Sequence, residues 1–169
     1  MDTIFSSASN AQKSAIKIIR VSGSKVNNIP KIFSFKPTQP RVASIRKIYD
    51  LNNNIIDKAL IIYYPAPNTV TGEDVIEFQI HGSSIIEKKI YNVFSKIKTF
   101  RIAARGEFTK RAFLNGIIDL TQAEGLNDLI NSETEKQFKM SMSQYEGMLS
   151  SKIKLWRNEI VWLLSKLEA

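Results

Sequence analysis

The sequence predicts an α+β fold, in which a mixed β-sheet with helices is followed by an all-helical segment. Two observations predict it. Before residue 119, short runs rich in Ile, Val, Phe and Tyr are separated by Gly, Pro and Asn, as in strands joined by turns. After residue 119, apolar residues recur at helical spacing. We therefore expect an N-terminal domain at residues 1–118 and the start of a helical domain at residues 119–169.

Six short runs are expected to form the strands of the first domain. The turn at Asn52–Asn54 makes two of them a hairpin, because asparagine accepts positive φ more readily than most residues. Pro and Gly bound several of the others. In chain order the expected strands are Thr3–Ser7, Ala15–Val21, Arg41–Tyr49, Ile55–Tyr64, Glu73–Ile80 and Phe100–Ala104.

Two helices are expected within the first domain, one at Lys25–Phe33 and one that begins at Ser84. Ser84 and Glu87 have the spacing of a capping box, in which each side chain satisfies a free backbone N–H at the helix start. A helix across one face of a sheet of hairpins gives the α+β layer arrangement. The inner face of this second helix is expected to carry Ile86, Ile90, Val93 and Ile97.

The stretch from Gly106 to Gly125 joins the two domains. A helix is expected at Glu107–Leu114 and is closed by Gly116, because glycine tolerates the left-handed conformation that ends many helices. Asp119 is then the expected N-cap of the next helix, with Gln122 completing a capping box. The residues of the first helix expected to face inward are Phe108, Ala112 and Phe113.

A very long helix is expected to follow. Ser132 and Glu135 again have the capping-box spacing, and no stop signal precedes Ala169. Its apolar stripe has the a/d spacing of helices that pack on other helices. We therefore expect the chain to be a fragment of a longer protein rather than one with a self-contained coiled-coil tail. The stripe consists of Leu149, Ile153, Trp156, Ile160, Leu163 and Leu167.

Charge and composition narrow the function classes. The net charge is +8, and the sequence has no cysteine, which excludes disulfides and thiolate metal sites. Residues 1–118 contain 18 Lys and Arg against 8 Asp and Glu, whereas residues 119–169 contain 6 against 8. This asymmetry indicates an anionic partner for the first domain, or else only the Lys-rich composition of an AT-rich genome. Neither a membrane span nor a signal peptide is evident, so a cytoplasmic protein is expected.

The sequence contains no recognisable catalytic motif. None of the seven glycines is followed by lysine, so a P-loop is missing and this chain is not expected to hydrolyse GTP. The single histidine, His81, has no Cys or second His beside it, so we expect no metal site and no catalytic residue. We interpret it as a capped or solvated side chain at a strand end.

Two charged residues have unusual positions on their expected strands. Alternation places Arg20 on one face with Ile16 and Ile18, and Glu77 on one face with Val75 and Gln79. An arginine on an apolar strand face indicates an anion or a polar ligand. The alternative is that Arg20 and Glu77 pair with local charges such as Glu73 or Lys17.

Several motifs carry a resemblance to a known family. The sequences TGEDVIEFQIHG at Thr71–Gly82 and GEFTKRAFLNG followed by DLTQAEG at Gly106–Gly125 resemble the N-terminal part of the MnmE (TrmE) family of tRNA modification GTPases. The resemblance runs from DTIFSSAS near the N-terminus through IIRVSG to the end of the chain. It implies a GTP-hydrolysing parent enzyme whose GTP, Mg²⁺ and K⁺ sites lie in a domain that this sequence does not contain.

The resemblance also implies a cofactor and partners. Proteins of this family bind 5-formyl-tetrahydrofolate or a related tetrahydrofolate in this domain, form a homodimer through it, and act with the flavin-dependent MnmG on C5 of the wobble uridine of tRNA. The family's folate-contact positions in IIRVSG and TGEDVIE are matched by Arg20 and Glu77. We expect Glu77 to accept N–H bonds from the pterin edge, and Arg20 to meet the pterin carbonyl or the glutamate tail.

Two departures from the family pattern bear on this site. The motif NGKLDL reads NGIIDL here, so Ile117 replaces a lysine of the folate site. The missing charge-assisted hydrogen bond would be worth on the order of 1.5–3 kcal/mol, or roughly tenfold or more in affinity. In addition, HGG reads HGSS at His81–Ser84, which is expected to alter the start of the following helix.

A cluster of basic residues supports an alternative function. It is expected either to contact tRNA phosphates or to be a solvated surface. An alternative function is therefore a free-standing basic RNA-binding or scaffold module without folate chemistry. The cluster consists of Lys88, Lys89, Lys96, Lys98, Arg101, Arg105, Lys110 and Arg111.

Overall fold

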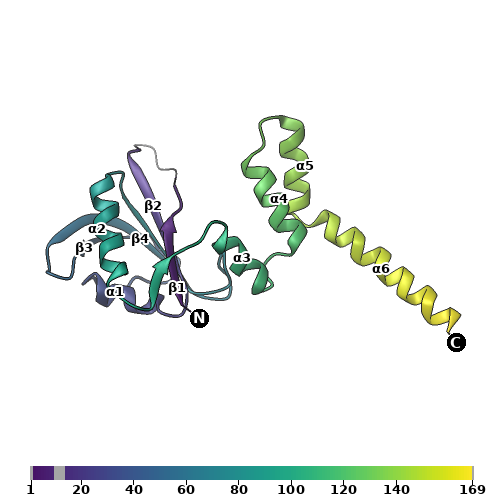
Figure 1. The fold of residues 1–169 in the computed structure, drawn as a ribbon, viewed down its shortest axis with the longest axis horizontal. Coiled ribbons are helices and arrows are strands. Elements are labelled where there is room, and N and C mark those ends of the chain that lie inside the picture. Colours follow the sequence, from purple (N-terminus) through teal and green to yellow (C-terminus); the bar gives the residue numbers. More distant parts are fainter. Residues whose placement is uncertain (1, 10–13, 169) are drawn as a thin grey trace. The chain divides into compact units, whose positions relative to one another are not determined.

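The structure, a computed structural model, describes residues 2–9 and 14–168 (Figure 1). Its contacts divide the chain into two compact units, Met1–Arg111 and Ala112–Ala169, which we describe separately. The first unit contains the β-sheet, so the α+β class expected from the sequence is confirmed. Its strands are β1 (Thr3–Ser7), β2 (Ile16–Ser22), β3 (Ser44–Tyr49), β4 (Ile55–Tyr64), β5 (Val75–His81) and β6 (Phe100–Ile102).

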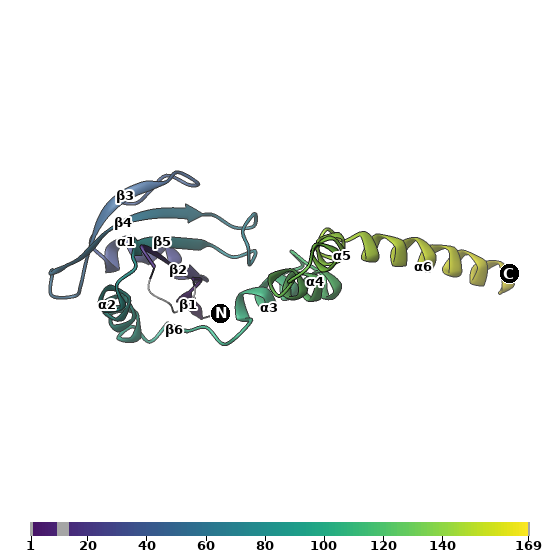
Figure 2. The same cartoon turned by 90° about the horizontal axis from the view of Figure 1, so that it is seen from above.

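The strands form one mixed sheet in the order β3-β4-β5-β2-β1-β6 (Figure 2). Its neighbours are antiparallel except β1 and β6, which run parallel. The expected bounds of β1 and β4 are confirmed, and the other strands differ by a few residues at their ends. Asn53 has φ +62° in the β3–β4 turn, as its asparagine-rich sequence predicts. The central pair β2–β5 determines which residues meet at the site described below.

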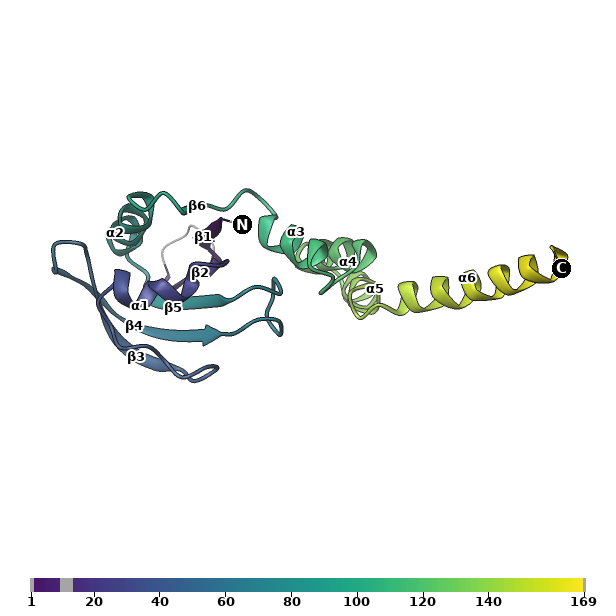
Figure 3. The same ribbon diagram turned by 90° about the horizontal axis from the view of Figure 1, so that it is seen from below.

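One face of the sheet is covered by helices. These are α1 (Ile29–Ile32), which follows the 3-10 turn Val26–Asn28, and α2 (Ser84–Ser95) (Figure 3). Alternate strand residues such as Ile19 and Phe78 point into this layer and are fully buried against Phe94 of α2. On the opposite face of β2 and β5, Arg20 and Glu77 are half-buried and Ile16 is exposed. Only the end of this face at Ser22 and Val75 is buried. This second face is therefore the one that can accept a ligand or another surface.

The start of α2 differs from the expected capping box. The N-cap is Ser83, one residue earlier than predicted, and its hydroxyl accepts a hydrogen bond from the backbone N–H of Ile85. Glu87 does not cap the helix, because it pairs instead with the buried Lys17 at 2.5 Å. Ser83 occupies the second glycine position of the family's HGG pattern, so the serine gives this helix a side-chain cap.

Helix α3 (Glu107–Leu114) begins after Gly106 and ends before Gly116, both at φ +70°. The left-handed Gly116 confirms the predicted helix end. Ala112 is buried as expected, whereas Phe113 is 43% exposed, so the expectation that Phe113 faces inward was wrong. The helix spacing was right, but the buried stripe lies on the side of Phe108, Arg111 and Ala112.

The second unit contains α4 (Leu120–Ile130), α5 (Glu135–Tyr145) and α6 (Met148–Leu167). The capping box of Asp119 and Gln122 at the start of α4 is confirmed. The box predicted for Ser132 and Glu135 is wrong, because Thr134 and Gln137 form it two residues later.

The single very long helix expected after residue 132 is also wrong. Gly147 adopts φ +82°, and this left-handed residue separates α5 from α6. Helices α4 and α5 pack against each other at Gly125, where a Cβ would lie 2.8 Å from the backbone nitrogen of Tyr145. Glycine is therefore required sterically at this contact.

Helix α6 exposes large apolar side chains around its circumference. Trp156 and Trp162 are 59% and 60% exposed, and none of the α6 residues is buried within the described part of the chain. The predicted apolar stripe is therefore present on α6, and no other described part of the chain covers it. Within the described residues, no helix is both long and apolar enough to cross a membrane.

Candidate ligand-binding site

Arg20 and Glu77 lie directly opposite each other on the antiparallel strands β2 and β5. The Nε of Arg20 donates a hydrogen bond to Oε1 of Glu77 at 2.7 Å. The two side chains are 28% and 14% exposed, so the pair is partly shielded but still reaches the surface. The face assignments made from the sequence are correct, and the register of the strands brings the two predicted residues together.

The expected alternative partners are engaged elsewhere. Lys17 is on the helix-covered side, where it pairs with Glu87. Glu73 pairs with Arg111 at 3.0 Å. The alternative is therefore confirmed in that Arg20 and Glu77 form a local ion pair, but its named partners were wrong, because the two residues pair with each other.

Tyr64, on the neighbouring strand β4, and Arg41, in the turn before β3, extend the site. Ile62 of β4 is opposite Glu77, so Tyr64, two residues further, points to the same face. Burial, together with the charge of Glu77, raises the pKa of the Tyr64 hydroxyl, which therefore stays protonated and can donate a hydrogen bond. The guanidinium of Arg41 lies 5.8 Å from the centre of the Tyr64 ring.

Phe108 borders the site from helix α3. The Cζ atom of Arg20 lies 5.9 Å from the centre of the Phe108 ring, within the range of a cation–π contact. Sequence reasoning treated Phe108 as a core residue and missed Tyr64 and Arg41 altogether. The alternation of β4 predicts the face of Tyr64, but only the β4–β5 register shows that this face is shared with Glu77.

The chemical capacity of the pair follows from its free atoms. In the described part of the chain, the two terminal nitrogens of Arg20 and Oε2 of Glu77 make no hydrogen bond. A carboxylate has about four lone-pair positions, so Glu77 can still accept two N–H groups while Arg20 donates to an acceptor beside them. The site therefore suits a planar ligand edge with two adjacent donors and one acceptor.

His81 has a structural partner. Its Nδ1 lies 2.7 Å from Oδ1 of the buried Asp57, and its backbone N–H donates to Oδ2 of the same carboxylate at 2.9 Å. The imidazole is nevertheless 72% exposed, so His81 is both tethered and solvated, as the sequence interpretation proposed. Across the described residues, no group of three or more His, Cys, Asp or Glu side chains is arranged to hold a metal ion.

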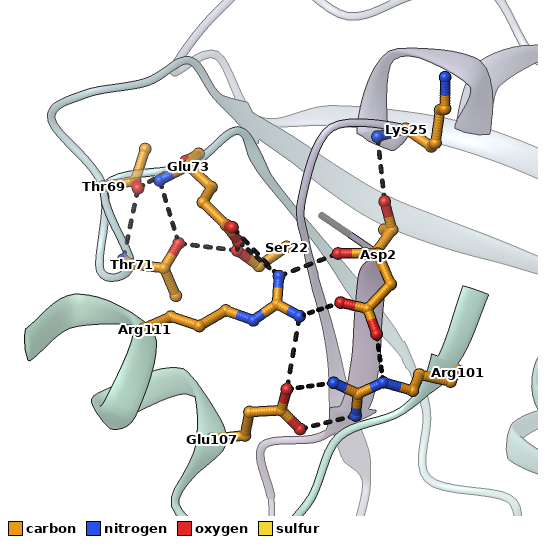
Figure 4. A network of polar contacts seen from close by, with 10 residues as sticks. Asp2, Ser22, Lys25, Thr69, Thr71, Glu73, Arg101, Glu107 and Arg111 are labelled. Carbon is orange, nitrogen blue, oxygen red and sulfur yellow. Dashed lines mark hydrogen bonds and ion pairs between the residues drawn. The ribbon is translucent and has the colours of Figure 1, made fainter. Parts of the chain in front are cut away.

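The two motifs that carried the family resemblance meet in a network of ion pairs (Figure 4). Arg111 donates to both oxygens of Glu73, at 3.1 and 3.0 Å, and to Oδ1 of Asp2 at 2.7 Å. Arg101 binds Asp2 and Glu107, and its hydrogen bond lowers the pKa of Glu107 to about 2. Several charged residues of the two motifs, including Glu73, Glu107 and Arg111, therefore stabilise the first unit by pairing with one another.

The same network removes two arginines from the basic cluster that was expected to contact phosphates. Arg101 and Arg111 are neutralised by Asp2, Glu73 and Glu107, so they are poor candidates for phosphate contacts. The other members form no ion pair with the residues that the structure describes, and they remain candidates for an anionic partner. These are Lys88, Lys89, Lys96, Lys98, Arg105 and Lys110.

The fold defines a class of protein: an α+β domain with a mixed sheet, followed by a helical region. The chain belongs to the MnmE/TrmE family. The family model described as GTP-binding protein TrmE N-terminus matches residues 3–117, and the model described as MnmE helical domain matches residues 120–169. The division predicted after residue 118 falls between the two matched ranges and remains a prediction.

Curated relatives agree with the family models. The tRNA modification GTPase MnmE of Anaplasma marginale (strain St. Maries) is 43% identical over 169 residues, and that of Wolbachia pipientis subsp. Culex pipiens (strain wPip) is 44% identical. The tRNA modification GTPase MnmE of Rickettsia bellii (strain OSU 85-389) is 42% identical over 171 residues. The matches cover 99 to 100% of this chain but 38% of each relative, so the chain spans about two fifths of their length.

Proposed function

We propose that this chain is the cofactor-binding part of a tRNA modification GTPase, and that it binds a tetrahydrofolate one-carbon cofactor at Arg20 and Glu77. The observation that supports this proposal most strongly is the Arg20–Glu77 pair on the sheet face opposite α1 and α2. A pterin presents an amino group and a ring N–H beside a carbonyl. The carboxylate of Glu77 accepts the two N–H groups, and the guanidinium of Arg20 donates to the carbonyl.

The wider function follows from the family. We propose that the whole protein acts in the cytoplasm with MnmG on C5 of the wobble uridine of tRNA, and that this chain by itself does not hydrolyse GTP. We further propose that the first unit forms a homodimer through the sheet face opposite α1 and α2. Ile16 and Ile45, both on that face, are each 58% exposed, which supports an apolar interface around the site.

Titration calorimetry with 5-formyl-tetrahydrofolate tests the cofactor proposal. The chain should bind the ligand, and Arg20→Ala or Glu77→Ala should weaken binding about tenfold or more, because each removes a charge-assisted hydrogen bond. Arg157→Ala and Glu135→Ala are matched controls on exposed helix positions. No heat at millimolar ligand, together with salt-sensitive tRNA binding, would favour the RNA-binding alternative.

A further inference from the structure

Arg111 is an unusually enclosed cation outside the proposed cofactor contacts. Its side chain is 9% exposed, and it is held by the carboxylates of Glu73 and Asp2 and by the backbone oxygen of Asp2 at 3.0 Å (Figure 4). Removing one partner from such a shielded pair leaves an uncompensated charge, so the arrangement is energetically demanding. Arg111 therefore has a structural role that a solvated surface arginine would not have.

The contacts of Arg111 form a closed ring with Arg20. Ser22, two residues after Arg20 on the same face of β2, donates its hydroxyl to Oε2 of Glu73 at 2.7 Å. The same carboxylate accepts from Arg111 on α3. Phe108 lies three residues before Arg111, about one helical turn away, and its ring contacts the guanidinium of Arg20. The ring thus joins β2, the loop before β5 and α3 at fixed positions.

We propose that Arg111 is a positioning residue for the ligand site: through Glu73 and Ser22 it holds α3 so that Phe108 fixes the guanidinium of Arg20. This inference rests on the proposed cofactor function. Arg20 is then held from two directions, by Glu77 through its Nε and by the ring of Phe108, which leaves its terminal nitrogens for the ligand. An arginine that is already ordered loses less side-chain entropy on binding.

The position of α3 beside Arg20 depends on the ion pairs of Arg111 and not only on the packing of Phe108. Phe108 is only half-buried, so its packing is not sufficient to define the position of the first turns of α3. Glu107 adds a second attachment on the same turn, since it binds Arg101 and lies 3.4 Å from Arg111. The buried Thr71 hydroxyl, 2.7 Å from Ser22, completes the support of the Glu73 loop.

Two readouts on the full 169-residue chain test the proposal. The first is the affinity for 5-formyl-tetrahydrofolate. The second is the NMR signal of the Nε–H of Arg20, assigned with Arg20→Lys, which reports the Glu77 hydrogen bond and the ring current of Phe108 without any ligand. Arg111→Gln and Phe108→Leu should each move this signal toward that of a free arginine, and should weaken binding roughly three- to tenfold.

Matched variants separate positioning from folding. Phe108→Tyr keeps the aromatic ring, so the Arg20 signal and the affinity should stay near those of the native chain. Leu114→Ala changes an exposed position of the same helix and should alter neither readout. If Arg111→Gln does not fold, Ser22→Ala decides, because it removes the Ser22–Glu73 hydrogen bond and keeps Arg111; an unchanged Arg20 signal in that variant then overturns the proposal. An unchanged Arg20 signal in a folded Arg111→Gln or Phe108→Leu variant overturns the proposal. If the signal moves as expected but the native chain binds no folate, the cofactor function fails and the positioning role stands.

Discussion

Arg20 and Glu77 are 57 residues apart in the sequence, yet the register of β2 and β5 places them directly opposite each other, 2.7 Å apart. Their side chains lie on the face of the sheet that α1 and α2 leave open. Tyr64 and Phe108 border the pair from two other elements. The site is therefore assembled from β2, β4, β5 and α3, and its support depends on the network around Glu73 and Arg111.

Acid should weaken the first unit through Glu107. Its pKa in the folded state is about 2, below the ordinary value of 4.5, chiefly because Arg101 donates hydrogen bonds to it. A lowered pKa stabilises the fold above the unfolded-state value, and that stability is lost as the pH falls from about 4.5 toward 2. Urea unfolding followed across this range should show the loss, and Glu107→Gln should flatten it.

Glu135→Gln is the control for this experiment, because Glu135 pairs with Lys139 on an exposed helix surface. Exposed pairs of this kind contribute little to stability. If Glu107→Gln has the same acid dependence as the native chain, the network does not stabilise the folded state in the way that its geometry indicates.

Gly125→Ala should destabilise the second unit. Alanine favours a helix over glycine by about 1 kcal/mol, but its Cβ would lie 2.8 Å from the backbone nitrogen of Tyr145 and 3.1 Å from the carbonyl carbon of Gln144. Overpacking of this kind costs about 1–3 kcal/mol, so we expect a net loss of up to about 2 kcal/mol. Urea unfolding monitored by far-UV circular dichroism measures it. Glu124→Ala, on the exposed side of α4, should change little; an equally stable Gly125→Ala variant would contradict the close packing.

The exposed stripe of α6 should be covered in solution by a neighbouring surface. Trp156→Asp places a charge in that stripe and should lower the helix content or change the oligomeric state, because α6 has little packing of its own. Sedimentation velocity and far-UV circular dichroism measure both. Asn158→Asp adds the same charge to the helix outside the stripe. A native monomer with full helix content that Trp156→Asp leaves unchanged would refute the expectation.

Restoring the family lysine should strengthen cofactor binding. Ile117→Lys returns an ammonium group to the position that the family motif assigns to the folate site, and we expect affinity to rise roughly tenfold. Ile118→Lys adds the same charge one residue away. Equal gains in the two variants would show a general electrostatic effect, and no gain in Ile117→Lys would remove this position from the site.

The sequence predicted the elements whose signals are local. β4 has its expected bounds, and Asp119 with Gln122 forms the expected capping box. The segment after Asn131 was harder, because Ser132–Glu135 and Thr134–Gln137 both fit the capping pattern and only the second forms. Gly147 lies within the single long helix that the sequence predicted, but it has φ +82° and divides that helix into α5 and α6.

The site was predictable only in part for a related reason. Strand alternation placed Arg20 and Glu77 on their correct faces, whereas their pairing depends on the register of two strands far apart in the chain. Glu87 left its expected capping role because the buried Lys17 requires a counter-charge. The contact of Phe108 with Arg20 needs the ion pairs of Arg111, which join segments 38 and 109 residues apart in the sequence.

The role of Glu77 in cofactor binding is tested most directly by titration calorimetry. The affinities for 5-formyl-tetrahydrofolate and for an analogue that lacks the 2-amino group are measured in the native chain and in Glu77→Gln. If the carboxylate of Glu77 accepts the amino-pyrimidine edge, the native chain should bind the analogue about tenfold or more weakly, and Glu77→Gln should discriminate far less. Equal discrimination by both proteins, or no binding of either ligand to the native chain, would contradict it.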